Sequence, residues 1–145
     1  KMPTIVAVQS FGSDNIVRNL TNDTFEMKPS HTVADSIAVD IPRNFYMAKQ
    51  FLHKYKGEGL TVDDNAILKA SAQLSKNTGL FAEPAAATAF AGFLNYLENN
   101  RLEANSINVV LSTGSGLKDL QAIQQIISIP EAINPELSEL KKLLS

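Results

Sequence analysis

The stretch EPAAATAFAG, residues 83–92, predicts a helix that packs closely against its neighbours. Pro84 fits the first turn of a helix running to about Asn100, because a proline there removes only an N–H that would have no helical partner. Alanine and glycine then dominate, so almost no side chain separates the first turns from whatever covers them. These small residues therefore favour close helix packing.

Glu83 directly precedes this helix, where the positive end of the helix dipole favours a carboxylate. That structural role is the simpler interpretation of Glu83 taken alone. The functional alternative is a carboxylate at the mouth of a cofactor site.

A second stretch, LSTGSGLKDL at residues 111–120, follows a β-branched run that predicts a strand over residues 107–111. Ligands of open α/β sheets bind beyond the carboxyl ends of the strands, so Thr113 stands in the expected place. Its hydroxyl can donate and accept hydrogen bonds. Gly114 and Gly116 allow a close backbone approach or a positive φ. Spacing alone still favours a tight turn that Thr113 caps, and the GxxxxGK[ST] pattern of a phosphate loop is absent.

The rest of the chain alternates strands with helices. A first strand is predicted at residues 4–8, a loop at 21–31 and a turn at 57–59 before LTV, and apolar residues alternate over 31–39. Helices are predicted after Ser13 or Asp14 to about Leu20, over 42–55, behind a Thr61–Asp64 capping box to Gly79, over 84–100, to about Ile127, and from Pro135. This order predicts a single α/β domain, residues 1–145, with parallel crossovers. A sheet of only two or three strands leaves open edges, which predicts that part of the fold is missing.

Composition excludes several classes of function. The 145 residues carry a net charge of −2 with scattered basic residues, so neither nucleic acid nor an acidic membrane surface is an expected partner. The absence of cysteine excludes disulfides and thiolate metal sites and fits the cytoplasm. No apolar run approaches the roughly 20 residues of a membrane helix. Because the chain enters a strand directly after Lys1, Met2 and Pro3, we expect it to be truncated.

Two further residue types are candidates for chemistry. Lys118 lies beside the glycine loop and would be a candidate Schiff-base nucleophile, although an exposed lysine that begins a helix is the favoured interpretation. His31 and His53 have no partner at metal-ligand spacing, so no metal site is expected.

Three stretches together resemble threonine synthases, which are fold-type II (tryptophan synthase β-like) pyridoxal-phosphate enzymes. They are TVADSIAVDIP, GLFAEPAAATAFAGF and VVLSTGSGLKD, at residues 32–42, 79–93 and 109–119, and the opening PTIVAVQSFGSDNIVRNL is also similar. The Glu-Pro-Ala motif is shared by several fold-type II enzymes. The Thr-Gly-x-Gly-Leu-Lys-Asp motif resembles threonine synthases more than serine or threonine dehydratases, which usually carry a Ser-Gly-Gly-Asn stretch there. The resemblance implies a C-terminal portion of that fold, a partial three-layer parallel sheet flanked by helices.

The resemblance implies a role for each motif residue. Thr113 would hydrogen-bond the pyridine nitrogen of pyridoxal phosphate and, as a neutral partner, leave it largely unprotonated. Glu83 would lie near the ring edge, and Gly114 and Gly116 would let the chain pass beside the ring.

Other parts of the family pattern fit less closely. Phe11 and Gly12 would border the substrate, while Ser115 replaces a histidine that family members often carry. The Schiff-base lysine, the asparagine beside the ring oxygen and the phosphate loop of the family lie upstream of Pro3. The resemblance therefore implies no catalytic residue within this chain.

The implied function is part of a lyase that converts O-phosphohomoserine to threonine and phosphate. The chain alone would be inactive and would need the N-terminal part of the same protein, in a family that is commonly dimeric. A dehydratase of the same fold type is one alternative. A non-catalytic module that binds a small anion or a partner protein through an exposed sheet edge is the other.

Overall fold

The computed structural model describes residues 2–124 and 132–144. Two parallel strands, β1 and β2, pair in register from Val6 opposite Glu58 to Ser10 opposite Val62. The elements in chain order are β1 (Val6–Ser10), a 3-10 turn (Val17–Asn19), a second 3-10 turn (Asp35–Ile37), α1 (Phe45–Lys54), β2 (Glu58–Val62), α2 (Asp64–Thr78), α3 (Pro84–Glu98), a third 3-10 turn (Gly116–Lys118), α4 (Leu120–Gln124) and α5 (Leu137–Leu144). The predicted extension of α4 to Ile127 lies outside the described residues.

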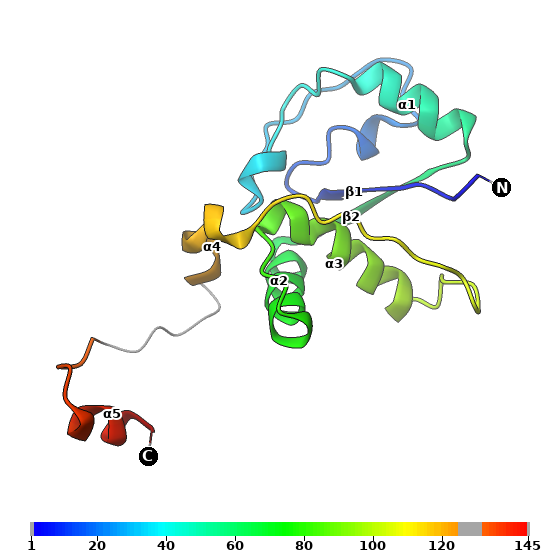
Figure 1. Ribbon diagram of the computed structural model, residues 1–145. Helices are drawn as coiled ribbons and strands as arrows, with labels where there is room; N and C mark the ends of the chain where they lie inside the picture. Colours follow the sequence, from blue (N-terminus) through cyan, green and yellow to red (C-terminus); the bar gives the residue numbers. More distant parts are fainter. Residues whose placement is uncertain (1, 125–131, 145) are drawn as a thin grey trace.

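Helical segments cover both faces of the two-stranded sheet. Figure 1 shows α1 and its connecting segments on one side of β1 and β2, with α2 and α3 on the other. Gly59 faces the first side, since a Cβ there would lie 2.8 Å from Leu20 Cδ1. On the other side of the sheet, Gly92 of α3 faces β1, since a Cβ there would lie 2.5 Å from Val8 Cγ2. The predicted layering of helices around a parallel sheet is therefore present.

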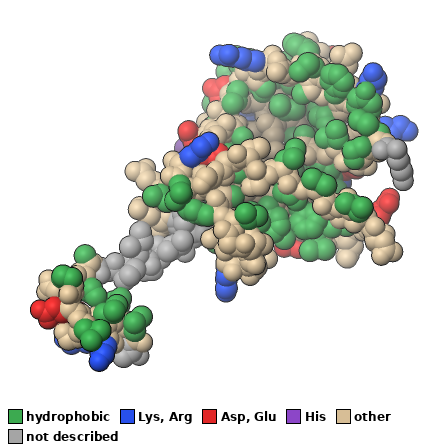
Figure 2. Space-filling model, viewed as in Figure 1, with side chains coloured by type: hydrophobic (Ala, Val, Ile, Leu, Met, Phe, Trp, Pro, Cys, Tyr) green, Lys and Arg blue, Asp and Glu red, His purple; other side chains and the backbone are tan. Residues whose placement is uncertain are grey.

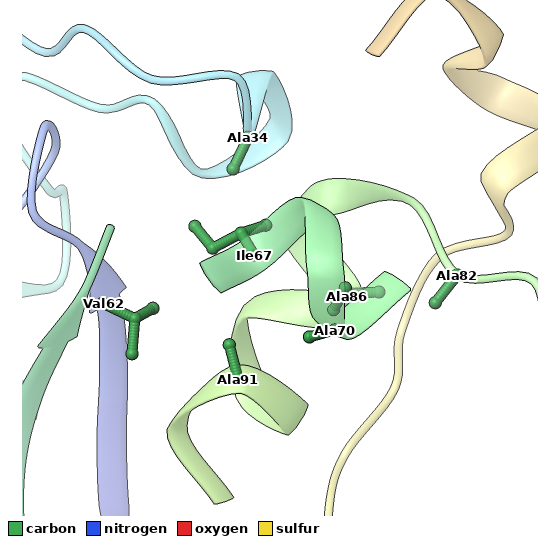
Figure 3. Packing of buried hydrophobic residues seen from close by; sticks show 8 residues of the cluster. Ala34, Val62, Ile67, Ala70, Ala82, Ala86 and Ala91 are labelled. Carbon is green, nitrogen blue, oxygen red and sulfur yellow. The ribbon is translucent and has the colours of Figure 1, made fainter. Parts of the chain in front are cut away.

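The main core lies between the sheet and the pair α2 and α3. Figure 3 shows how small side chains from several elements converge there, with Ile67 of α2 beneath Ala34. Its buried members are Ala34, Val62, Ile67, Ala70, Ala82, Ala86, Ala87 and Ala91. The buried alanines of α3 thus let this helix lie close to both α2 and β1, and the close packing that the sequence predicts is present.

The ends of α2 differ from the predicted capping. Asp63 is the N-cap, and its side chain accepts a 2.7 Å hydrogen bond from the Ala66 N–H. The predicted Thr61–Asp64 capping box is therefore wrong, because Thr61 belongs to β2 and Asp64 bonds elsewhere. The C-terminal prediction is confirmed: Gly79 ends the helix with a φ of +76°, a conformation that favours glycine.

The second strand is not the one that the sequence predicts. Residues 107–111 form no strand, and all except Val110 are exposed, with Ile107 at 94% and Val109 at 79%. No described segment pairs with them, and a strand is stable only when its hydrogen-bonding groups and one face are covered. The predicted turn at 57–59 instead enters β2. There the glycines permit close approach, because a Cβ on Gly57 would lie 2.9 Å from Ile5 O.

The segment after β1 also departs from its prediction. The expected helix to Leu20 is only a 3-10 turn over Val17–Asn19, and residues 31–39 contain another. Buried asparagines organise this segment through backbone contacts: Asn15 binds Lys28 O at 2.7 Å, and Asn19 binds Glu26 O at 3.0 Å. Side-chain amides that bond the backbone in this way compete with helix formation.

The other helices follow the sequence with small shifts at their ends. Phe45 and Leu52 of α1 are buried, as the predicted apolar face requires, and α5 begins at Leu137 rather than at Pro135. None of the helices within the described residues is long and apolar enough to cross a membrane.

Candidate functional site

The two motifs that open the sequence analysis meet in space. Ala82 and Ser115 form an antiparallel bridge, which places the glycine loop against the segment before α3. The Glu83 N–H donates to Gly114 O at 3.1 Å, and the Gly116 N–H donates to Phe81 O at 2.9 Å. The loop is thus fixed to the start of α3 by backbone bonds, which do not depend on the identity of the side chains.

Glycine is required in this loop by close approach. A Cβ on Gly114 would lie 1.8 Å from Glu83 Oε1, and one on Gly116 would lie 2.5 Å from the Phe81 ring. Neither glycine has a positive φ. The sequence allows either close approach or a positive φ as the reason for these two glycines, and the structure favours close approach. At Gly114 the loop approaches the Glu83 carboxylate.

Glu83 is a buried carboxylate without a protein partner. Glu83 as a whole residue is only 6% exposed, and its side chain makes no hydrogen bond or ion pair within the described part of the chain. It occupies the N-cap of α3 without capping it through its side chain. The helix dipole favours its charge there, but buried carboxylates normally accept hydrogen bonds. The unused acceptors and the adjoining pocket make Glu83 a candidate for binding a ligand.

A pocket of about 420 Å³ lies beside Glu83. The 3-10 turn after residue 34 and the start of α4 contribute to its wall. Its lining residues are Asp35, Ser36, Glu83, Lys118, Asp119 and Gln121. Three carboxylates and one ammonium group therefore face this space, which suits a ligand that carries both a cationic and an anionic group.

Lys118 lines this pocket from the end of the 3-10 turn Gly116–Lys118. The side chain is exposed, and no ion pair with a described residue holds it. Figure 2 shows one face of the molecule on which basic side chains are scattered rather than gathered into a patch. Lys118 thus has the exposed position that its sequence context favours.

Thr113 lies at the beginning of the glycine loop, next to Gly114. It is exposed, and its hydroxyl makes no hydrogen bond with a described residue. The loop is capped by Ser115 instead, whose Oγ accepts from the Leu117 N–H at 3.3 Å. Thr113 therefore does not cap its own turn, although spacing alone favours that role. Its hydroxyl is available to a ligand.

Phe11 and Gly12 lie at a different place from the Glu83 pocket. Phe11 follows β1 and is 63% exposed, while Gly12 packs against the backbone of His31, where a Cβ would lie 1.8 Å from the carbonyl oxygen. Neither residue lines the pocket. Asp35 and Ser36 do so instead, and the sequence reasoning missed them although they lie within the quoted TVADSIAVDIP stretch.

Metal-ligating residues do not gather in this region. Across residues 2–124 and 132–144, no group of three or more His, Cys, Asp or Glu side chains could hold a metal ion. His53 uses its Nε2 at 2.8 Å from Leu20 O.

The chain resembles known proteins over most of its length. Residues 1–114 match the family described as pyridoxal-phosphate dependent enzyme. The threonine synthase of Methanocaldococcus jannaschii is 29% identical across 99% of this chain, and that of Halalkalibacterium halodurans is 28% identical across 92%. The chain spans about a third of the length of these curated relatives, 36% in each case. The resemblance to threonine synthases that the motifs indicate is confirmed.

Solved structures share the fold. The threonine deaminase of T.th. aligns over 77% of this chain and 39% of its own, with a TM-score of 0.61 at 23% identity. The L-serine ammonia-lyase of Rhizomucor miehei aligns over 85% of this chain and 41% of its own, with a TM-score of 0.68 at 18% identity. The predicted fold class, an α/β fold of the fold-type II kind, is confirmed.

Proposed function

The chain belongs to the family of pyridoxal-phosphate dependent enzymes, and we propose that it forms part of a threonine synthase, which converts O-phosphohomoserine to threonine and phosphate. The curated relatives that match almost the whole chain are threonine synthases. The motif TGSGLKD at residues 113–119 supports the same choice over a dehydratase. The substrate class proposed is accordingly an amino acid that carries a phosphate ester.

One observation carries the proposal. Glu83 holds a buried carboxylate that has no partner among the described residues, directly against the backbone of Gly114, where no side chain would fit. The pocket beside Glu83 gives a ligand room, and the carboxylate supplies an acceptor at its edge. Thr113 adds a hydroxyl without a hydrogen-bond partner among the described residues. A flat heteroaromatic ring with a polar nitrogen and polar substituents fits this combination of groups.

These residues have distinct proposed tasks toward the cofactor. Thr113 bonds the pyridine nitrogen, and its neutral hydroxyl leaves that nitrogen largely unprotonated. Glu83 accepts a hydrogen bond at the ring edge, while Gly114 and Gly116 let the loop pack against Glu83 and Phe81 and so pass beside the ring. When bound, pyridoxal phosphate acts as an electron sink for a carbanion formed on the substrate.

The proton-transferring lysine is proposed to lie in a segment of the whole enzyme that precedes this chain. Lys118 is exposed and lines the pocket beside Asp119. In this position it can contact an anionic group of a ligand, but the proposal gives it no covalent role. The chain by itself is therefore expected to be inactive.

The test is an absorption spectrum with added pyridoxal phosphate. The chain is measured alone and then together with the upstream segment of the same gene. We expect a protein-bound cofactor band only in the mixture. Thr113→Ala and Glu83→Gln should each shift that band, whereas Ser112→Ala, an exposed neighbour, should leave it unchanged. A borohydride-reducible band from the chain alone would overturn the assignment, because a lysine within it would then be the anchor.

The substrate is tested separately in the complete enzyme. O-phosphohomoserine should yield threonine and phosphate in equal amounts, with little ammonia released from serine or threonine. Deamination of serine or threonine as the main activity would replace threonine synthase by a dehydratase of the same fold. The cofactor assignment of Thr113 and Glu83 would survive that result, because the spectrum tests it independently.

A further inference from the structure

Asp64 bonds to two separate loops from the first turn of α2. Its Oδ1 accepts from the Thr32 hydroxyl at 2.6 Å and from the Ser10 hydroxyl at 3.0 Å. Its Oδ2 accepts from the Val33 N–H at 3.0 Å. Both carboxylate oxygens are therefore engaged, and the helix N-terminus favours the charge that makes these hydrogen bonds strong.

The first of these loops leaves the carboxyl end of β1. Ser10 is fully buried, and its Oγ also accepts from the Gly12 N–H at 3.2 Å. Gly12 in turn accepts from the His31 N–H at 2.8 Å, which leads back to Thr32. Asp64, Ser10, Gly12 and the stretch from His31 to Thr32 thus form a closed circuit of hydrogen bonds. The circuit fixes the turn at Phe11 and Gly12 relative to α2.

The second loop leads directly into the pocket. Ala34 follows Val33, is fully buried and packs over Ile67, as Figure 3 shows. The next two residues, Asp35 and Ser36, belong to the 3-10 turn that contacts α3 and lines the pocket beside Glu83. Asp35 and Ser36 are exposed, so the residues on either side of them hold the turn: Thr32 and Val33 before it, and Ile37 after it, whose carbonyl accepts from the Ser13 hydroxyl at 3.1 Å. The anchor at Thr32 and Val33 therefore fixes the N-terminal side of this pocket wall.

We infer that Asp64 is a positioning residue for the substrate side of the site: it holds the Asp35–Ser36 wall of the pocket and the Phe11–Gly12 turn in fixed positions. Asp64 itself does not line the pocket. The inference rests on the proposed function, since it assigns the anchored segments to the substrate rather than to the cofactor ring. Glu83 and the glycine loop after Thr113, which are proposed to face the ring, are joined by a backbone bond between the Glu83 N–H and Gly114 O that does not involve Asp64.

The chain offers a matched control at the neighbouring position. Asp63 carries the same charge on the same helix end and caps it through the Ala66 N–H, but its side chain has no hydrogen bond to either loop among the described residues. Asp63→Ala therefore removes the same charge and weakens the same helix end as Asp64→Ala, but it leaves the bonds from Asp64 to the two loops in place. Asp64→Asn is the subtler variant, because an amide can still accept from the two hydroxyls but presents a donor to the Val33 N–H.

The test uses the complete cofactor-loaded enzyme, with hydrogen exchange and kinetics measured on the same samples. In Asp64→Ala and Asp64→Asn we expect backbone exchange over residues 32–37 to rise about tenfold or more, because the lost bonds are charge-assisted. KM for the amino-acid substrate should rise about tenfold, because a misplaced wall weakens substrate positioning. The cofactor absorption band should stay where it is, and Asp63→Ala should change neither exchange at 32–37 nor KM.

A second pair of variants covers the case in which Asp64→Ala fails to fold. Thr32→Val removes one hydroxyl with little change of shape, and Thr32→Ser restores it. The inference requires that Thr32→Val raises exchange and KM and that Thr32→Ser reverses both effects. Equal KM in the Asp63 and Asp64 variants, or an unchanged exchange rate over 32–37, would overturn it. If the wild-type enzyme lacks threonine synthase activity, the proposed function fails, while exchange still decides whether Asp64 anchors the loops.

Discussion

The two loop regions near the carboxyl ends of the strands are held in opposite ways. The region after β1 is held by buried polar side chains, of which Ser10, Asn15 and Asn19 are fully buried. The loop of residues 113–118 is held by backbone hydrogen bonds and by the absence of side chains at Gly114 and Gly116. Removing atoms should therefore damage the first region, and adding atoms should damage the second.

The largest effect is expected at Asn15, where atoms are removed. Its Nδ2 donates to Lys28 O and Val39 O, and its Oδ1 accepts from the Lys28 N–H at 2.9 Å. Asn15→Leu leaves these backbone groups without partners in a buried place, so the free energy of unfolding should fall by about 3–6 kcal/mol. Urea denaturation measures the change.

The control for Asn15 is an asparagine with an exposed side-chain bond. Asn99 donates to Asn95 O at the end of α3, where water can replace the bond. Asn99→Ala should change the free energy of unfolding by no more than about 0.5 kcal/mol. A loss below about 1 kcal/mol for Asn15→Leu would mean that the region after β1 does not depend on its buried amides.

A smaller effect is expected at Gly114, where atoms are added. The new Cβ of Gly114→Ala would collide with the Glu83 carboxylate, which must move, and such overpacking costs about 1–3 kcal/mol. Denaturation of the single and double variants forms a cycle with Glu83→Ala. Gly114→Ala should cost less when Glu83 is already truncated, because the colliding group is gone.

Gly79→Ala separates this collision from a conformational effect. A Cβ at Gly79 meets no atom within 4 Å, but its φ of +76° is strained for alanine, which costs about 1 kcal/mol. That cost should be the same whether or not Glu83 is present. If truncating Glu83 leaves the cost of Gly114→Ala unchanged, the close approach of these residues does not determine the loop.

The sequence predicts the elements whose stabilising contacts are local or simple. Pro84 and the alanines after it specify α3, and Gly79 specifies the end of α2, because each property belongs to a few consecutive residues. The place of the glycine loop beside Glu83 was harder to predict. It depends on the bridge between Ala82 and Ser115, which joins residues far apart in sequence.

The strands reveal what local pattern cannot supply. The β-branched residues 107–111 have the stronger strand pattern but no partner among the described residues, whereas Glu58–Val62 has a weak pattern and pairs with β1. Pairing, rather than residue type, decides between them. The wall residues Asp35 and Ser36 were missed for a similar reason, since their place beside Glu83 depends on Asp64, which lies about thirty residues further along the chain.

The smallest effect is expected in a third polar cluster, which is partly open to solvent. The Tyr96 hydroxyl donates to Glu58 Oε2 at 2.6 Å, and Arg101 pairs with the same carboxylate while its guanidinium lies 4.0 Å from the Tyr96 ring. The Glu58 and Arg101 side chains are 44% and 42% exposed. Tyr96→Phe should therefore lower the free energy of unfolding by only about 1 kcal/mol at pH 8.

The contribution of Tyr96 should also disappear in strong alkali. Burial, and then the Glu58 carboxylate, raise the pKa of Tyr96 from 10.0 to about 12. Because the folded protein binds this proton more tightly than the unfolded chain, the stabilisation is complete below pH 10 and is lost as the pH rises toward 12. The difference in the free energy of unfolding between wild type and Tyr96→Phe should shrink over that interval in urea denaturation, with Tyr46→Phe, a change at an exposed tyrosine, as control.

A difference that stays constant from pH 8 to pH 12 would show that the hydroxyl's bond to Glu58 is not what stabilises this cluster. The contrast between buried and open polar groups would then have to rest on Asn15 alone.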